Sequence, residues 1–244
     1  MCGRFVSTNS PERIAAYFGA SFDTEPLGEN HNVAPTTDVY GIVEPAATSA
    51  PVVRAFHWGL VPSWAKDTKI GSRMINARAE TIAEKPSFKR LLVKHRLIVP
   101  MDGFYEWRTL PGQKVKQPYF IRRRDGEPLA AAGLWSAWHD PAHPGDDGWL
   151  HSCTIITTEA NHLMAPLHDR MPVFLHAADW HEWLDPTMHD TLELQRLLRP
   201  APDDLLELIP VSTAVNNVRN RGCELIEPID FDLPFDPAGD QPAS

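Results

Sequence analysis

The first residues of the chain, Met1-Cys2-Gly3-Arg4-Phe5, contain its most reactive group. A methionine aminopeptidase removes an initiator Met that precedes a small residue, so we expect the mature chain to begin at Cys2. An α-amine with a pKa of about 8 and a thiol with a pKa of about 8.5 would then belong to one residue. Such a 1,2-aminothiol condenses with an aldehyde to an imine, and the thiol closes on the imine carbon to give a thiazolidine. The sequence therefore indicates covalent chemistry with an aldehyde.

A Cys at the second position is also common as an incidental small residue, and the position alone does not separate the two interpretations. Gly3 allows a close approach of the backbone, and Arg4 can bind an anion beside the terminus. Phe5 and Val6 are typical of the start of a strand, which would fix the terminus in the core. A fixed terminus favours the catalytic interpretation.

Composition places the chain among ordinary globular proteins. Its 244 residues are 43% hydrophobic and 23% charged, which suits one large domain or two small ones. No apolar run has the length of a membrane span, and the three cysteines, Cys2, Cys153 and Cys223, lack CxxC spacing. We therefore expect a cytoplasmic protein without disulfides. The 23 prolines predict short elements and long ordered loops.

Charge is distributed unevenly along the chain. Residues 54–124 hold 16 Lys and Arg but only five Asp and Glu, although the whole chain has a net charge of −9. A nucleic acid responds to the local field, so this basic segment is compatible with a phosphate-binding face. A solvated surface of mixed charge is the alternative.

Periodicity predicts short helices and strands in alternation. We expect helices over residues 10–18, 85–94 and 159–167, one running from the segment 75–81 through Ala83, and two within 178–198 with Trp180, Trp183, Leu192 and Leu197 as core residues. We expect strands over 39–43, 52–58, 96–101, 118–123, 129–138, 151–158, 173–175 and 208–212. Residues 139–149 are expected to form an exposed loop, and residues 231–244 an acidic, Pro-rich, disordered tail after a domain at 1–230.

Two ionisable residues stand out beside these elements. Glu106 lies between Tyr105 and Trp107 at the end of an apolar strand, where it is either solvated or desolvated with a raised pKa. His168 is followed by an Asp and an Arg that would tune its charge, although an isolated His is more often structural. Trp58 and Trp64 flank a Pro/Gly-broken loop and are either core residues or stacking surfaces for bases.

Seven segments, in consistent order over nearly the whole chain, resemble the SOS response-associated peptidase (SRAP) family. They are MCGRF at 1–5, NVAP at 32–35, WGLVPSW at 58–64, INARAET at 75–81, DGFYEW at 102–107, HDRMP at 168–172 and VSTAVNNVRNRGCELIEPI at 211–229. Members of that family sense abasic sites in single-stranded DNA. They cross-link to the ring-opened aldehyde of the lesion through an N-terminal Cys and form a thiazolidine.

The resemblance implies four catalytic residues. Cys2 resembles the nucleophile, and Asn76 the amide that positions the terminus. Glu106 resembles the acid/base that moves protons during imine formation and ring closure. His168 resembles the residue that opens the sugar hemiacetal and later reverses the adduct.

The resemblance also implies five DNA-binding residues. Arg4 and Arg78 look like phosphate clamps around the lesion, which would hold DNA without reading its sequence. Trp64 and Trp107 occupy positions where the family packs apolar surface against DNA, and Pro35 lines the same groove.

The family fold is a single α+β domain with a curved, barrel-like antiparallel β-sheet surrounded by short helices, and we expect it here. We expect single-stranded DNA with abasic sites as the partner, no membrane, no organic cofactor and a monomer that associates with the nucleoid when bound to DNA. No metal is expected, because His139 and His143 have no third ligand at a suitable spacing. The chain departs from the family at 139–149 and after about residue 230, which leaves local DNA contacts there open.

Two alternatives remain from the residues. An N-terminal-nucleophile cysteine peptidase would use the same Cys, Asn, Glu and His, for example to remove Met1 from its own chain. A non-catalytic module for single-stranded DNA would need the Arg and Trp residues but not Cys2.

Overall fold

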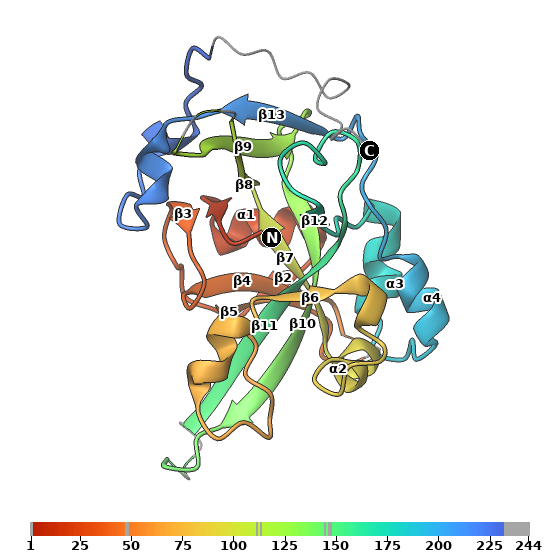
Figure 1. Ribbon diagram of the computed structural model, residues 1–244. Helices are drawn as coiled ribbons and strands as arrows, with labels where there is room; N and C mark the ends of the chain where they lie inside the picture. Colours follow the sequence, from red (N-terminus) through yellow and green to blue (C-terminus); the bar gives the residue numbers. More distant parts are fainter. Residues whose placement is uncertain are drawn as a thin grey trace.

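The computed structural model describes residues 2–46, 49–110, 112, 114–143, 145 and 148–231. Two β-sheets organise this part of the chain, and both contribute side chains to the interior cluster that contains Cys2. In Figure 1 the N-terminal end lies in the middle of the molecule, with β13, β9 and β8 above it and β4, β5, β10 and β11 of the larger sheet below.

The larger sheet closes on itself. Its path runs β12-β11-β10-β7-β4-β5-β2, and β5 pairs again with β11, so five of the strands form a ring. The ring strands are β4 (Asp38–Val43), β5 (Val52–Trp58), β7 (Arg96–Met101), β10 (Leu129–His139) and β11 (Trp149–Glu159). Short strands extend it at β2 (Ser21–Phe22), β6 (Asn76–Arg78) and β12 (Arg170–Pro172).

The second sheet is antiparallel throughout, in the order β13-β9-β8-β1-β3. Its strands are β1 (Phe5–Ser7), β3 (Asn30–Val33), β8 (Gly103–Arg108), β9 (Gln117–Arg123) and β13 (Leu206–Pro210). The expected α+β fold with a curved, barrel-like sheet is confirmed. The sequence did not predict that β5 and β6 each run parallel to β11, or that β2 runs parallel to β5.

Successive side chains of the ring strands point alternately to the inside and the outside of the ring, and therefore contribute to two separate cores. In β7, Leu97 and Val99 belong to the interior cluster with Cys2, whereas Ile98 belongs to an outer cluster covered by helices. The interior of a five-stranded ring has little room for side chains. Gly41 faces the ring of Phe56, where a Cβ atom would lie only 2.7 Å from the aromatic carbon, so a larger residue cannot fit without a shift.

Short helices cover the outer cluster. They are α1 (Pro11–Phe18), α2 (Lys89–Lys94), α3 (Trp180–Leu184) and α4 (Thr191–Arg196), with α3 and α4 beside each other in Figure 1. The predicted N-terminus of α1 is confirmed, because the Ser10 side chain accepts a hydrogen bond from the Arg13 backbone N–H. Gly19 ends α1 in the left-handed conformation.

Arg96 connects two of these helices from within the protein. It is 4% exposed and donates hydrogen bonds to the carbonyls of Leu92 and Val93 at the end of α2, and to those of Trp183 and Asp185 at the end of α3. These carbonyls have no partner within their own helices, so one guanidinium satisfies the ends of both. Burial lowers the pKa of Arg96 to about 10, which leaves it charged at neutral pH.

Two predicted helices are wrong. The segment from 75 through Ala83 contains the strand β6 and then the 3₁₀-helix Ala79–Thr81, because β6 is held by pairing with β11. Residues 159–167 form hydrogen-bonded turns instead of a helix. Pro166 has no N–H for a helical bond, and the Asn161 side chain accepts from the Met164 N–H as in a turn.

Most of the other predicted elements occur with shifted ends, and only Lys89–Lys94 of the segment 85–94 is α-helical. The strand predicted at 173–175 is wrong, because β12 (Arg170–Pro172) ends before it and Phe174 forms only an isolated bridge with Ala131. Trp183 is buried as expected, but Leu192 is 75% exposed and is not a core residue. Residues 232–244 of the predicted tail, and Pro144, Asp146 and Asp147 of the predicted loop, lie outside the described residues. No helix of the described chain is long and apolar enough to cross a membrane.

Candidate active site

Cys2 is completely buried in the folded protein. Its exposed fraction is 0%, and it belongs to the interior cluster between the two sheets. The strand β1 begins three residues later, and its first residue, Phe5, pairs with Val33 of β3 and Phe104 of β8. The N-terminal strand expected from Phe5 and Val6 is confirmed, and it fixes the chain immediately after Cys2.

Asn76 contacts Cys2 directly. Its side-chain Nδ2 donates a hydrogen bond to the Cys2 carbonyl oxygen over 2.9 Å. Asn76 is the first residue of β6, which the parallel pairing with Ile155 of β11 holds in place. Its Oδ1 is buried and has no hydrogen-bond partner within the described chain. A buried amide oxygen without a partner is costly, so this atom is available to a donor that the folded chain does not supply.

Glu106 is the acidic group next to Cys2. It lies on β8, is 4% exposed, and its pKa is raised by burial. Burial also raises the pKa of the Cys2 thiol far above its usual range, and the Glu106 charge raises it further, against a hydrogen bond from the Arg4 backbone. The thiol is therefore protonated at neutral pH, and Glu106 is a nearby group whose affinity for protons is increased.

His168 lies in the turn before β12. Its Nδ1 accepts a hydrogen bond from the Arg170 backbone N–H over 2.9 Å, and Asp169 Oδ1 lies 2.7 Å from the same nitrogen. The two contacts require opposite protonation of Nδ1. The backbone N–H is fixed in a strand, whereas the Asp169 side chain is 84% exposed, so we assign the proton of neutral His168 to Nε2.

The surroundings of His168 favour its neutral form. Burial lowers its pKa, and the cations Lys116 and Arg170 lower it further, whereas Asp169 acts in the opposite direction. Lys116 also lowers the pKa of Glu106. One cation therefore acts on both groups, which indicates that His168 and Glu106 belong to the same region of the molecule.

An ion pair connects the turn of His168 to the segment of Asn76. Arg170 donates to both carboxylate oxygens of Glu80, over 2.8 and 2.9 Å, and also to the carbonyl of Thr157. Glu80 follows Asn76 by four residues, and Arg170 follows His168 by two. We call this pair the Glu80–Arg170 clamp, because its bidentate geometry fixes both segments relative to each other.

Arg4 is tied to the protein rather than exposed. Its Nη1 donates to Asn32 Oδ1 over 2.8 Å and to the Val215 carbonyl over 2.9 Å. The guanidinium lies 5.7 Å from the centre of the Trp107 ring, and the Trp107 Nε1 donates to Asn216 Oδ1. The structure therefore groups Arg4 with Trp107, and a phosphate clamp at Arg4 would have to use its remaining donors.

Asn32 supports this group from below the surface. It is 1% exposed, and its Nδ2 donates to the carbonyls of Val215, Asn217 and Asn220. Its Oδ1 accepts the hydrogen bond from Arg4, so one amide holds both the cation and the turn at 215–220.

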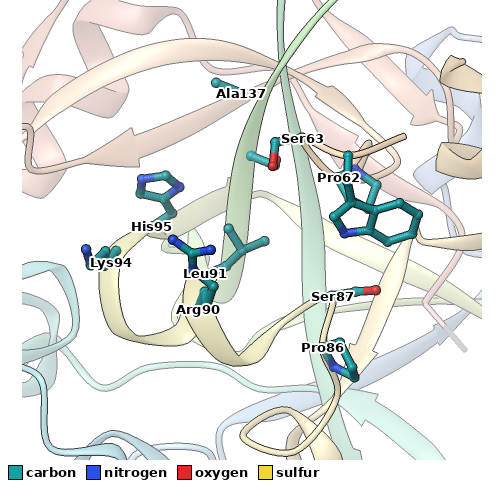
Figure 2. Close-up of a pocket in the computed structure, with 11 residues that line it drawn as sticks. Pro62, Ser63, Pro86, Ser87, Arg90, Leu91, Lys94, His95 and Ala137 are labelled. Carbon is teal, nitrogen blue, oxygen red and sulfur yellow. The ribbon is translucent and has the colours of Figure 1, made fainter. Parts of the chain in front are cut away.

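The other predicted DNA-binding residues lie outside this group. Arg78 is exposed, two residues after Asn76. Pro35 is half-buried in a turn that continues into Thr36, whose φ of 67° is unusual for a β-branched residue. Trp64 is 63% exposed and lines a cavity beside α2. Figure 2 shows Pro62 and Ser63, which precede Trp64 in the sequence, at the same cavity.

The sequence analysis missed Asn32, Glu80 and Arg170 as site residues. Asn32 and Glu80 stood inside quoted segments without a role, and Arg170 was considered only for its effect on His168. A polar residue in an apolar segment is a signal for Asn32, since it must find partners when buried. Glu80 and Arg170 are 90 residues apart in sequence, and nothing local indicates that they pair.

The site combines groups suited to proton transfer at a fixed nucleophile. A protonated thiol lies near a carboxyl group with a raised pKa, and an amide holds the adjacent carbonyl. This arrangement supports nucleophilic chemistry in which one carboxyl group gives and takes protons.

A family model described as SOS response associated peptidase (SRAP) matches residues 1–218. The chain therefore belongs to the SRAP family, as the seven quoted segments indicated.

Named relatives extend this result. The chain is 43% identical over 230 residues to the abasic site processing protein YoqW of Bacillus subtilis, which covers 93% of this chain and 99% of the relative. It is 34% identical over 239 residues to the abasic site processing protein YedK of Escherichia coli, which covers 94% of this chain and 100% of the relative. A crystal structure of a protein from Bacteroides thetaiotaomicron is 27% identical, with a TM-score of 0.81, and covers 93% of this chain and 100% of that one.

Proposed function

We propose that this protein captures abasic sites in single-stranded DNA covalently, through Cys2, after removal of Met1. The observation that carries the proposal is the 2.9 Å hydrogen bond from Asn76 to the Cys2 carbonyl. This bond fixes the peptide that follows Cys2, so the amine and the thiol of one residue keep a single orientation toward an aldehyde. The names of the relatives, which are abasic site processing proteins, support this choice of substrate.

The proposed reaction needs no oxidant or reductant. The Cys2 amine adds to the aldehyde of the ring-opened sugar, and the resulting carbinolamine loses water to form an iminium ion. The thiol then loses its proton, the sulfur attacks the iminium carbon, and a thiazolidine with a neutral ring nitrogen forms. Each step moves one proton, and the net by-product is one water molecule.

Glu106 suits both proton transfers. Because burial raises its pKa, Glu106 is more readily protonated than an exposed carboxyl group and can protonate the leaving hydroxyl group of the carbinolamine. The carboxylate that results can take the proton of the Cys2 thiol, which burial keeps protonated. One residue therefore serves as acid and then as base.

His168 is proposed to help open the sugar hemiacetal. With its proton on Nε2 and its pKa lowered, it is a neutral hydrogen-bond donor at the sugar oxygen rather than a cation. The Glu80–Arg170 clamp keeps the segments of His168 and Asn76 in a fixed position relative to each other during this step.

The exposed guanidinium of Arg78 is proposed to hold a phosphate next to the lesion, with Arg4, Trp107 and Pro35 along the same strand. These contacts bind the backbone and the bases without reading sequence, which suits a lesion that can occur anywhere.

Intact mass spectrometry with a single-stranded oligonucleotide carrying one abasic site tests the proposal. We expect the protein without Met1 to gain the mass of the oligonucleotide minus one water, in an adduct that survives heat and maps to Cys2. Cys2→Ser is the matched control, since it keeps the amine and removes the thiol. It should give an imine that only a hydride reductant traps, and a heat-stable adduct formed by Cys2→Ser without reductant would contradict thiazolidine formation.

The family description also names a peptidase, and the same experiment separates this activity. If Glu106→Gln retains Met1 when it is produced in the same host, the chain processes its own terminus. Normal removal of Met1 from Glu106→Gln assigns the step to the host aminopeptidase. A wild-type chain that begins at Cys2, binds the oligonucleotide and forms no adduct would support a non-catalytic binding module instead.

A further inference from the structure

A cavity of about 200 Å³ lies between α2 and the loop that follows Trp58. Figure 2 shows Arg90, Lys94 and His95 on one side of it, on α2 and directly after it, with Pro62 and Ser63 on the other. Trp64, Ser87 and Ser136 also line the cavity. We call it the α2 cavity.

The α2 cavity is positively charged. Arg90 and Lys94 lie one helical turn apart, and neither forms an ion pair within the described part of the chain. None of the residues that line the cavity is acidic. No acidic side chain of the described chain is therefore paired with either cation, and the spacing of the two suits the oxygens of a phosphate group.

The same cavity contains a flat apolar surface and several hydroxyl groups. Trp64 is 63% exposed, an unusual state for the largest apolar side chain. Three serines, Ser63, Ser87 and Ser136, are among the other residues that line the cavity. An indole surface, two cations and neutral hydroxyls are the features that a nucleotide needs, since its base stacks and its phosphate is an anion.

We propose that the α2 cavity holds a nucleotide of the captured strand at a distance from the lesion, with its base on Trp64 and its phosphate between Arg90 and Lys94. This inference rests on the proposed function, because it takes the same DNA strand as the ligand.

The α2 cavity and the candidate active site are connected by a short segment of the chain. The Trp58 Nε1 donates to the carbonyl of Ile75, the residue before Asn76, so Trp58 lies beside the candidate active site. Six residues of extended chain from Trp58 to Trp64 span at most about 20 Å. A strand that rises about 3.4 Å per nucleotide covers this span in about six nucleotides. The cavity is therefore within reach of one continuous strand.

The charge distribution favours a strand over a free nucleotide. All but two of the residues that line the cavity belong to the basic segment 54–124, and the exposed cations Lys85 and Lys89 are neighbours of lining residues in the sequence. A polyanion that passes over this surface gains from all of these charges, whereas a mononucleotide gains only from the two in the cavity.

Salt-dependent binding of two oligonucleotides tests the proposal. Each carries a tetrahydrofuran abasic analogue, which cannot open to an aldehyde, and is extended by ten nucleotides on either the 5′ or the 3′ side. We compare Arg90→Ala/Lys94→Ala with Lys85→Ala/Lys89→Ala, which removes the same charge from the same region but spares the lining.

With one of the two extended oligonucleotides, the slope of log Kd against log salt should fall by about 0.7 for the lost phosphate contact in Arg90→Ala/Lys94→Ala, and by less in the control. Trp64→Ala should weaken binding of that oligonucleotide about tenfold. Equal slopes for both double variants, or no effect with either oligonucleotide, would overturn the proposal.

Two further readouts complete the test. Saturable binding of deoxyadenosine monophosphate to the wild-type protein, lost in Arg90→Ala/Lys94→Ala, would overturn the assignment to a strand. The analogue reports non-covalent binding only, so the result does not depend on Cys2 chemistry. If the wild-type protein forms no covalent adduct but the slope still changes, the proposed function fails and the α2 cavity remains a DNA site.

Discussion

Replacing Glu106 with Gln is expected to stabilise the protein at neutral pH and to slow covalent capture. Glu106 is 4% exposed, and burial raises its pKa, so the folded protein binds this proton more tightly than the unfolded chain. The contribution of such a carboxyl group to stability is complete below its unfolded pKa of about 4.3. It is lost as the pH rises through the folded pKa, and Gln, which does not ionise, removes this loss.

Linkage sets the size of the effect at about 1.4 kcal/mol for each unit between the folded and unfolded pKa. Poor solvation of a buried polar group costs about 1–3 kcal/mol. We therefore compare the free energies of unfolding of Glu106→Gln and the wild-type protein. Their difference should be about 1–3 kcal/mol more in favour of Glu106→Gln at pH 8 than at pH 4. Capture should slow by about 10²–10⁴-fold, the usual contribution of a general acid/base.

Urea unfolding of both proteins at pH 4 and pH 8 measures the stability difference, and the rate of adduct formation measures capture. Glu84→Gln, at an exposed carboxylate, is the control and should change neither quantity. A stability difference that is the same at both pH values, or that favours the wild-type protein more at pH 8, would refute the reasoning.

Three further substitutions test other parts of the structure. Asn76→Ala removes the hydrogen bond to the Cys2 carbonyl and should slow adduct formation about tenfold or more, while binding of single-stranded DNA is retained. The time course of adduct formation measures the first effect, and fluorescence anisotropy measures binding. Arg96→Met leaves four helix-end carbonyls without a donor and should cost about 3–5 kcal/mol in urea unfolding; a loss below about 1 kcal/mol would contradict it. Thr36→Gly relieves the positive φ and should raise the free energy of unfolding by about 1 kcal/mol, whereas a decrease would show that the Thr36 side chain makes a stabilising contact.

Local signals predicted the elements whose stability is local. The helix after Ser10 has a capping hydroxyl, a proline in its first turn and a glycine after its last residue, and it forms as expected. The apolar run at 97–101 predicts a buried strand because each of its side chains is more stable away from water, and all six residues of β7 are buried, including Arg96 before the run.

Pairing between distant segments explains the failures. Residues 76–78 include good helix formers, but hydrogen bonds to β11, almost 80 residues later, hold them as a strand. Closure of the ring depends in the same way on parallel pairing between Trp58 and Cys153, which no local pattern indicates.

The same distinction between local and long-range information applies to the candidate site. The reactivity of Cys2 follows from its own functional groups, so it could be inferred from one residue. The target of the Asn76 amide and the partner of Arg170 depend on which strands become neighbours, and only the folded structure supplies that information.

The burial of Cys2 also limits when its amine can be produced. The strand after it pairs with β8, which ends at Arg108, so the ribosome must synthesise more than a hundred residues before the first strand can complete its sheet. At about 5–20 residues per second, Cys2 remains accessible for about 5–20 s during translation. The folded protein leaves Cys2 0% exposed, so Cys2 is more accessible during this interval than after folding. Under the proposed function, which needs the free amine of Cys2, this interval is a time during which Cys2 is accessible to a host aminopeptidase.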